Sequence, residues 1–497
     1  MAISNPGNLL NAVPGPKQQA TASNYLDLAS TANEGWAQQY VPDLIEQEAE
    51  VFGPRTISGF LSQVGAEESM TADQVVWSEQ GRLHLSYTAT MTDNNGNING
   101  SDNTGKITIT DHIDTNATYT SGSHGIRVND TVIVANDEAV IKALVSEVDG
   151  NVVELRPYGA ADCSAITDAK TNLTVLVYGS EFAKGTTYNS AAAAATERRG
   201  SNEPTFKSYN NKPIIMKDYY EVSGSDASRI GWVEVASEDG TAGYLWYLKA
   251  QSETRLRFTD YVEMAMLEGE LGVHGTDKVD DFLSANGDAT GTQGLFAAIE
   301  SRGNVTTGIT GVNSTTDLAE FDAILAEFDK QGSIEENMLF VNRSVSLAID
   351  DMLASMNSYG AGGTSYGVFE NNEDMALNLG FSGFRRGSYD FYKSDFRYLN
   401  DKATRGGIND AAGANAIRGV FIPAGTSTVY DQLLGKNIKR PFLHVRFRAS
   451  ATDDRRMKTW VTGSVGAATS ALDAMQMHML TERCLVTQGA NNFMLMK

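Results

Sequence analysis

Cysteine, proline and long apolar runs are scarce in this sequence. It has 2 cysteines and 10 prolines among 497 residues. Cys163 and Cys484 lie far apart and make no disulfide framework, which fits a reducing compartment. Nothing approaches the roughly 18 consecutive apolar residues of a membrane-spanning helix, so we expect no membrane partner. The N-terminus lacks the basic start and apolar core of a signal peptide, which predicts synthesis in the cytosol.

Basic residues are also in short supply. The chain has 39 Lys and Arg against 62 Asp and Glu, a formal net charge of −23. Such a surface repels phosphate backbones, which argues against tight or sequence-specific nucleic-acid binding. It is compatible with a wall that encloses nucleic acid without binding it. The hydrophobic content of 41% is that of a folded protein, and the length predicts two to four subdomains.

Motifs for catalysis, cofactors and metals are missing. The loop from Asn95 to Lys106 has no carboxylate at its first or twelfth position, where a calcium loop needs one. The GAGG stretch at 360–363 does not fit a phosphate loop, and neither cysteine has a nucleophile signature. No two histidines are spaced i, i+4, so we expect surface or core positions for all six. They are His84, His112, His124, His274, His444 and His478.

The sequence therefore predicts no enzyme, no cofactor and no catalytic, cofactor-binding or metal-binding residues. Paired charges occur at Arg198-Arg199, at Asp350-Asp351 and in the run 453–456. They fit intersubunit ion pairs or a solvated surface, and the sequence leaves both interpretations open.

The first half of the chain divides into two parts. Residues 1–73 read as an extended N-terminal arm with a short helix. Residues 74–236 read as a long excursion of strands, carrying an all-β module at about 106–180. Five short strand candidates in that module predict a small barrel or sandwich. Asp149-Gly150 is a strong hairpin signal within it.

The second half begins with a long strand and a long helix. The stretch NKPIIMKDYYEVSGS, from Asn211 to Ser225, alternates with the period of a strand. A helix at about 239–272 follows, within a part that spans 237–305. Its apolar side is narrow and interrupted, which predicts an exposed helix. That side carries Tyr244, Leu248, Arg255, Phe258, Val262 and Met266.

The remainder predicts an α+β arrangement around a mixed sheet. Residues 306–435 alternate helix, strand and helix, and residues 436–497 read as C-terminal strands. The first helix of this part is expected to start on Asp317, with Glu320 as its capping partner.

This order of parts resembles the major capsid proteins of tailed bacteriophages, with their Hong Kong 97-like fold. Val222, Ser223 and Gly224 match the end of the strand that returns from the extended loop of that family. GIRVNDTVIVAND and VSEVDGNVVELRPYG resemble the β insertion of one branch, and GTQGLFAAIESRGN resembles the stretch after its spine helix. The length and acidity are also similar to the capsid proteins of crAss-like phages.

The resemblance implies an extended loop at 74–236 with the small all-β insertion, and a P-domain with the spine helix at 237–305. It implies an A-domain at 306–435 and C-terminal strands at 436–497 that return to both domains. No long helical prefix precedes the arm, so we expect no cleaved scaffolding segment, and a separate scaffold protein or none.

The implied function is self-assembly into pentamers and hexamers of an icosahedral shell around double-stranded DNA, without specific DNA binding. Expected partners are copies of the same chain and other virion proteins, such as portal, decoration or scaffold proteins. The expected location is the virion, after assembly in the host bacterial cytoplasm. Two alternatives remain: another virion protein of the tail or decoration type, and a hydrolase with an accessory β module.

Overall fold

The computed structural model divides the chain into two compact units. The first comprises Met1–Trp77 together with Tyr209–Lys497, and the second is Ser78–Ser208. Residues 1–65 of the predicted N-terminal arm, Arg198-Arg199 and the GAGG stretch lie outside the residues that the structure describes. Those residues are 66–80, 84, 86–94, 105–112, 124–185, 206–227, 234–236, 242–272, 291–332, 334–356, 383–431, 436–465 and 468–497.

The second unit is a closed, antiparallel β-barrel. Around the barrel the six strands follow the order β3-β4-β7-β6-β5-β8, and β8 closes on β3. They are β3 (Ser86–Asp93), β4 (Gly105–His112), β5 (Asp130–Ala135), β6 (Val140–Asp149), β7 (Val152–Pro157) and β8 (Leu173–Ser180).

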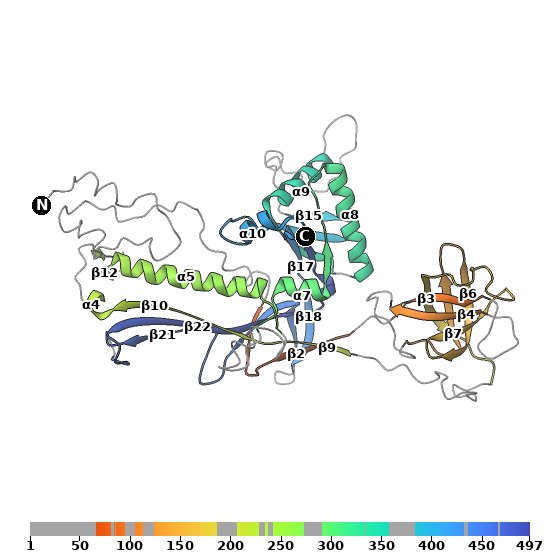
Figure 1. Ribbon diagram of the computed structural model, residues 1–497, viewed down its shortest axis with the longest axis horizontal. Coiled ribbons are helices and arrows are strands. Elements are labelled where there is room, and N and C mark those ends of the chain that lie inside the picture. Colours follow the sequence, from red (N-terminus) through yellow and green to blue (C-terminus); the bar gives the residue numbers. More distant parts are fainter. Residues whose placement is uncertain are drawn as a thin grey trace. The chain divides into compact units, whose positions relative to one another are not determined.

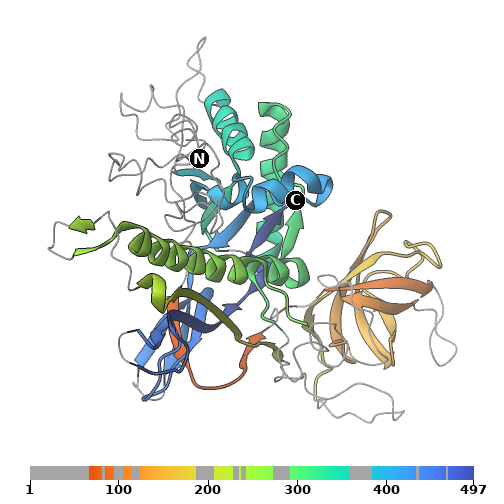
Figure 2. The ribbon, with the colours of Figure 1, turned by 60° about the vertical axis from the view of Figure 1, so that its left-hand side comes forward.

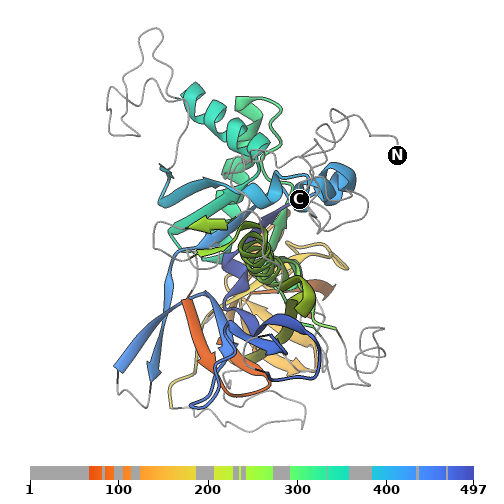
Figure 3. The ribbon, with the colours of Figure 1, turned by 90° about the vertical axis from the view of Figure 1, so that its left-hand side faces the viewer.

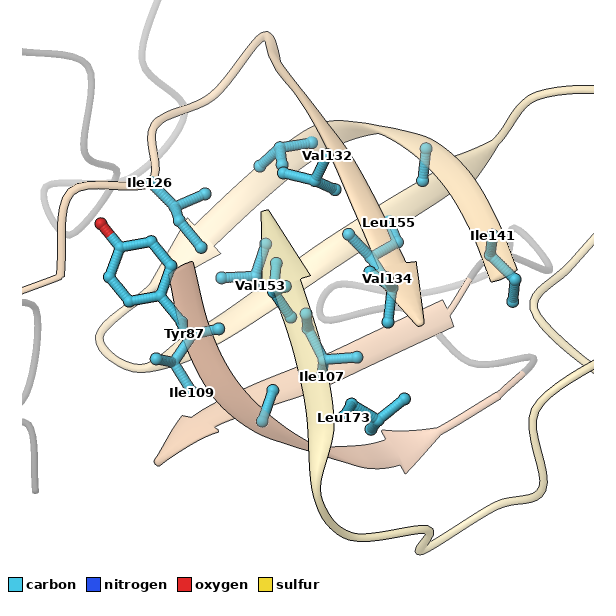
Figure 4. Packing of buried hydrophobic residues seen from close by; sticks show 14 of the residues in the cluster. Tyr87, Ile107, Ile109, Ile126, Val132, Val134, Ile141, Val153, Leu155 and Leu173 are labelled. Atoms are coloured by element: carbon cyan, nitrogen blue, oxygen red, sulfur yellow. The ribbon is translucent and has the colours of Figure 1, made fainter. Parts of the chain in front are cut away.

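Alternating apolar side chains fill the barrel. Ile107, Val132, Val134, Val153 and Leu155 point inward from three strands (Figure 4), and none has any solvent exposure. This is the period of two that a strand with one buried face requires. The expected hairpin is present between β6 and β7, where Gly150 adopts a positive φ of 59°.

The first unit contains a five-stranded mixed sheet. Its order is β1-β20-β22-β10, and β21 also pairs with β22. The strands are β1 (Ala66–Met70), β10 (Ile214–Ser223), β20 (Leu443–Arg448), β21 (Lys458–Gly463) and β22 (Ala474–Thr487). The helix α5 (Leu245–Glu268) lies along β10 and β22 (Figures 1 and 2).

A second, six-stranded mixed sheet has the order β13-β23-β17-β14-β16-β15. Its strands are β13 (Asn304–Thr306), β14 (Glu336–Val341), β15 (Gly383–Arg386), β16 (Tyr389–Asp395), β17 (Gly419–Pro423) and β23 (Met494–Met496). The helices α8 (Ser314–Gln331) and α9 (Arg343–Met356) lie side by side on this sheet (Figure 3) and share one apolar core with it. The helix α7 (Leu295–Arg302) belongs to a second core, shared with α5, β17 and β22.

The shorter elements complete the described chain. Three strand pairs are β2 (Val75–Gln80) with β9 (Phe206–Asn211), β11 (Glu234–Ala236) with β12 (Ala242–Tyr244), and β18 (Thr426–Asp431) with β19 (Lys436–Pro441). The short helices are α4 (Gly224–Ala227) and α10 (Arg405–Ala412). Three 3-10 turns lie at Arg397–Leu399, Gly413–Asn415 and Ala490–Asn492.

Several expected elements are confirmed, with shifted boundaries. The helix, strand and helix predicted at the start of 306–435 are α8, β14 and α9. The long helix starts at Leu245 rather than at 239, because Ala242–Tyr244 pairs as a strand with β11. The helix α8 begins at Ser314, since Asn313 caps it by accepting the Thr316 N–H at 2.9 Å. The predicted start at Asp317 was therefore wrong.

The role expected for β10 is corrected by its strand pairing. It was predicted as the strand that returns from the extended loop. In the structure β9 pairs with β2, whereas all ten residues of β10 pair with β22. Pro213 lies between β9 and β10, and proline has no N–H with which to continue a ladder.

Within the described residues, no helix combines the length and the apolar character that crossing a membrane requires.

Candidate assembly surfaces

From Ala250 on, the helix α5 buries one narrow stripe, and Leu267 is buried beside the C-terminal end of this stripe. Phe258 and Val262 pack against Met477 and Met479 of β22. Arg255 was predicted to share this stripe but is exposed, because the buried positions repeat every four residues from Ala250. The buried side chains on this stripe are Ala250, Thr254, Phe258, Val262 and Met266.

The outer side of α5 remains open to solvent. Leu256 and Tyr261 each expose 45% of their surface, and Arg255 and Arg257 are exposed beside them. A helix that buries such a small part of its circumference offers the rest to a partner or to solvent.

The face of the neighbouring sheet that points away from α5 carries an aromatic row. Tyr219 of β10 pairs with His478 of β22, and His478 pairs with Trp460 of β21. The Tyr219 and His478 ring centroids are 6.2 Å apart, and those of His478 and Trp460 are 5.1 Å apart. Because Met477 and Met479 face α5, strand alternation turns His478 to the opposite face.

This aromatic row is part of a larger exposed surface. Ile215, Tyr219 and Trp460 expose 53%, 58% and 37% of their surface. Lys217 and Lys458 occupy the next row of the same face, on either side of Leu480. Contiguous exposed apolar residues with polar neighbours mark interaction surfaces. The aromatic row and its flanking residues Ile215, Lys217 and Lys458 are called the ladder face below.

The two-stranded sheet of β2 and β9 is called the ribbon below. Arg302 at the end of α7 contacts the ribbon at its root, the part that belongs to the first unit. Its guanidinium carbon lies 5.4 Å from the ring centroid of Trp77 in β2 and 4.5 Å from that of Tyr209 in β9. The same guanidinium donates to the Thr487 carbonyl at 3.4 Å and to the Gln293 side chain at 3.3 Å. One side chain thereby contacts both strands of the ribbon, β22 of the five-stranded sheet and the loop before α7.

Asn211 fixes the end of β9 in the same region. It is 1% exposed, and its amide donates to the carbonyls of Gln293 and Leu485 at 2.9 and 2.6 Å. Its side-chain oxygen accepts the backbone N–H groups of Gln293 and Lys212, both at 2.9 Å. A buried amide with every polar atom satisfied rigidifies its surroundings.

Tyrosines are exposed on the outer wall of the barrel. Tyr158 and Tyr178 expose 46% and 50% of their surface. The Tyr158 hydroxyl donates to Glu181, and this hydrogen bond raises the pKa of Tyr158 to about 12. The ring therefore stays neutral and fixed at physiological pH.

Two small pockets lie in the described part of the first unit, and charged side chains in each of them already contact other groups of the chain. One, of about 270 Å³, lies beside α9 and contains Arg418, which donates to the carbonyls of Ile309 and Lys497. The other, of about 240 Å³, contains the ion pairs Glu268–Arg405 at 2.7 Å and Glu300–Lys497 at 2.6 Å. The described residues contain no group of three or more side chains arranged to hold a metal ion.

The paired charges that the structure describes make contacts within the chain. Asp350 lies 2.5 Å from the Lys393 amine, and both side chains are nearly buried. Asp453 pairs with Lys458 at 2.6 Å. Arg455 pairs at 3.1 Å with Glu482, which is buried. For Asp350 neither sequence interpretation applies, because its partner lies on β16 of the same sheet domain.

The histidines occupy varied positions, and His124 is part of the barrel core. Its exposure is 0%. Its Nδ1 accepts the Ile126 N–H at 3.3 Å, so Nε2 donates to the Gly150 carbonyl at 2.9 Å. His444 is also buried, at 1% exposure, whereas His478 is half-buried in the ladder face.

Comparison with known proteins gives matches only among solved structures. No family model matches the chain, and no curated protein matches it. A structure titled for Microbacterium phage Oxtober96 aligns with 95% of this chain and 99% of its own, at 9% identity and a TM-score of 0.36. The capsid of cyanophage P-SCSP1u aligns with 95% of this chain and 98% of its own, at 8% identity and a TM-score of 0.37.

A third match is the capsid of a native GTA particle. It covers 94% of this chain and 98% of its own, at 9% identity and a TM-score of 0.37. The solved structures that it resembles include phage capsids. The resemblance to crAss-like phages stays a prediction.

Proposed function

We propose that this chain is a major capsid protein, which self-assembles into the pentamers and hexamers of an icosahedral shell around phage double-stranded DNA. One observation carries the proposal. The layer formed by α5 and the β10–β22–β21 strands carries exposed apolar side chains on both of its sides, with Leu256 and Tyr261 outside the helix and the ladder face on the far side of the sheet. A layer with two exposed apolar sides is suited to burial by other chains.

The parts of the capsid fold map onto the elements as follows. The β2–β9 ribbon is the extended loop, and the barrel is its insertion. The helix α5 and the five-stranded sheet form the P-domain, with α5 as the spine. The six-stranded sheet with α8 and α9 forms the A-domain, to which the C-terminal strands β22 and β23 also connect. We make this assignment by analogy with the Hong Kong 97-like arrangement expected from the sequence.

The proposed mechanism is interface burial without chemistry. Each subunit presents several modest surfaces to several identical neighbours, and these contacts add through multivalency in closed symmetric rings. The net charge of −23 repels both other subunits and DNA. Repulsion from DNA suits a wall that encloses DNA without binding it. The partners proposed are further copies, together with portal, decoration or scaffold proteins, in a virion assembled in the host cytoplasm.

Electron microscopy of the purified, size-fractionated protein at low and high salt tests this function. Salt shortens the Debye length from about 10 Å at 0.1 M to about 3 Å at 1 M. Repulsion between subunits is then screened, so rings of five or six subunits and closed shells should increase with salt. A chain that stays monomeric under every condition would contradict the proposal and direct attention to a substrate screen.

The ladder face provides a surface variant for the same experiment. Tyr219→Ser removes an exposed ring from it, and Tyr392→Ser removes a ring of 52% exposure on β16 as a matched control. The first should weaken assembly without lowering the thermal midpoint of the subunit, whereas the second should change neither. Equal assembly of both variants would remove the ladder face from the proposed interface.

A further inference from the structure

Arg302, Asn211 and Gln293 form one connected network at the root of the ribbon. The backbone N–H and carbonyl of Gln293 both hydrogen-bond to the side-chain amide of Asn211. The side-chain oxygen of Gln293 accepts a hydrogen bond from the Arg302 guanidinium. Asn211 and Arg302 also bind β22, two residues apart. Asn211 donates to the Leu485 carbonyl, and Arg302 donates to the Thr487 carbonyl. The network therefore links β9, the loop before α7, the end of α7 and β22.

The aromatic partners bring β2 into the same network. Trp77 is 8% exposed, and its ring centroid lies 6.3 Å from that of Tyr209. The guanidinium lies near both rings, so a single planar cation contacts one aromatic side chain from each strand. Such contacts strengthen when they are shielded from water.

The position of this contact along the ribbon is specific. Trp77 is the last residue of the first unit on the outgoing strand, and Tyr209 is its first residue on the returning strand. Arg302 thus grips both strands where the chain leaves and re-enters the first unit. Lysine could not replace it, because a point charge lacks the planar fork that meets two rings, a carbonyl and an amide together.

We propose that Arg302 is a positioning residue for assembly: with Asn211 and Gln293 it clamps both strands of the ribbon at the first unit, so that the ribbon leaves that unit in the conformation that contacts a neighbouring copy. The inference rests on the proposed capsid function. Without the clamp the subunit remains folded, but the ribbon samples many exit directions, and ordering it on a neighbour costs conformational entropy.

Three variants test the clamp against a matched control. Arg302→Ala removes all of its contacts, and Arg302→Lys retains the charge without the planar face. Trp77→Leu keeps an apolar side chain but removes one ring. The control is Arg385→Ala, which removes an arginine of 62% side-chain exposure from a 3.6 Å ion pair with Asp390.

The first readout is hydrogen exchange of the unassembled subunit. Arg302→Ala should accelerate exchange in β2 and β9 by about tenfold, the size expected for losing two partly buried cation–π contacts. Arg302→Lys and Trp77→Leu should accelerate it by a smaller factor, and all three variants should leave α8 and α9 unchanged. The second readout is the assembled fraction well below the unfolding temperature, which should fall in the clamp variants and stay at the parent level in Arg385→Ala.

The possible outcomes separate the two proposals. If the parent chain never assembles, the capsid function fails, while the exchange measurement still reports on the clamp. If the parent assembles and Arg302→Lys assembles equally well, the positioning role is wrong. If exchange accelerates as much in α8 and α9 as in the ribbon, Arg302 only stabilises the fold and the inference is overturned.

Discussion

Individual buried polar residues connect segments of this chain that are far apart in sequence. Asn211 joins β9 to Leu485, and Lys393 joins β16 to Asp350 on α9. Glu482 on β22 is 4% exposed and lies between Arg448 and Arg455, at 2.8 and 3.1 Å. Each buried group has a partner, which is the condition for tolerating such a group in a core.

Lys393→Met should destabilise the first unit by about 3–5 kcal/mol, because it removes the ion pair between the Lys393 amine and the buried Asp350 carboxylate. The control is Lys330→Met, which removes a lysine of 71% exposure from its ion pair with Glu327 and should cost less than about 1 kcal/mol. Urea unfolding followed by circular dichroism measures both. Similar decreases in the free energy of unfolding for the two variants would show that the Lys393–Asp350 pair stabilises the fold no more than an exposed ion pair does.

The two cysteines should be inert in the native protein. Burial raises the pKa of Cys163 to about 11 and that of Cys484 to about 12, and the thiolate is the reactive form. We therefore expect neither thiol to react with Ellman's reagent at mildly alkaline pH until denaturant is added. Rapid modification of the native chain would contradict the burial of Cys163 in the barrel core and of Cys484 in β22.

Gly105→Ala should expose one thiol selectively. A Cβ at this position would lie 2.6 Å from the Cys163 sulfur, so the variant strains the barrel by about 1–3 kcal/mol. Cys163 should then become reactive, while Cys484 in the other unit stays protected. Thiol titration with mass mapping distinguishes the sites, and labelling of both at once would mean that the two units do not unfold independently.

The cap of α8 shows what sequence reasoning can miss at the scale of a residue. Asp317 and Glu320 fit a capping pattern, but Asn313 is also a favoured N-cap residue, and local composition does not decide between them. In the structure Asp317 is buried and accepts the Gly311 N–H at 2.8 Å, while Glu320 accepts the Thr310 N–H at 2.7 Å. Contacts with the preceding loop placed the helix start three residues earlier.

At the scale of elements, β22 was the strand that local pattern did not reveal. It runs for 14 residues and is buried along nearly all of its second half. Glu482 and Arg483 interrupt its apolar run, which hides the strand from a search for periodicity. Their partners come from β1, β20 and the chain before β21: Glu67, Arg448 and Arg455. Only the assembled sheet makes that sequence a core strand.

The helix α5 was predictable in type and in its narrow apolar side, and its stripe gives an element-scale test. Phe258→Ala should cost about 3–5 kcal/mol of unfolding free energy, because it opens a cavity against Met477 and Met479. Leu256→Ala on the outer side should change unfolding by less than about 0.5 kcal/mol and yet reduce assembly. Chemical denaturation and sedimentation measure the two effects. A large stability loss in Leu256→Ala would mean that this side is already covered in the subunit.

At the scale of the whole molecule, the two units have separate cores. The barrel cluster contains residues between Tyr87 and Val177 alone, and the other clusters draw on residues from Ile214 onward. The sequence predicted an all-β module here because its strands alternate and its turns are clear. The sequence analysis placed the start of the module near residue 106, because a Gly- and Asn-rich stretch separates β3 from β4. Local sequence signals cannot show that β3 pairs with both β4 and β8.

The fragment Ser78–Ser208 should therefore fold alone, as a barrel with a single cooperative unfolding transition. A fragment of residues 106–180, the boundary predicted from the sequence, lacks β3. It would leave β4 and β8 as open edges and expose apolar side chains of the core, so it should aggregate or bind a hydrophobic dye. Circular dichroism, calorimetry and dye binding compare the two fragments. If the shorter one folds as well as the longer, closure through β3 is not what stabilises the barrel, because the remaining five strands would then suffice to shield its core.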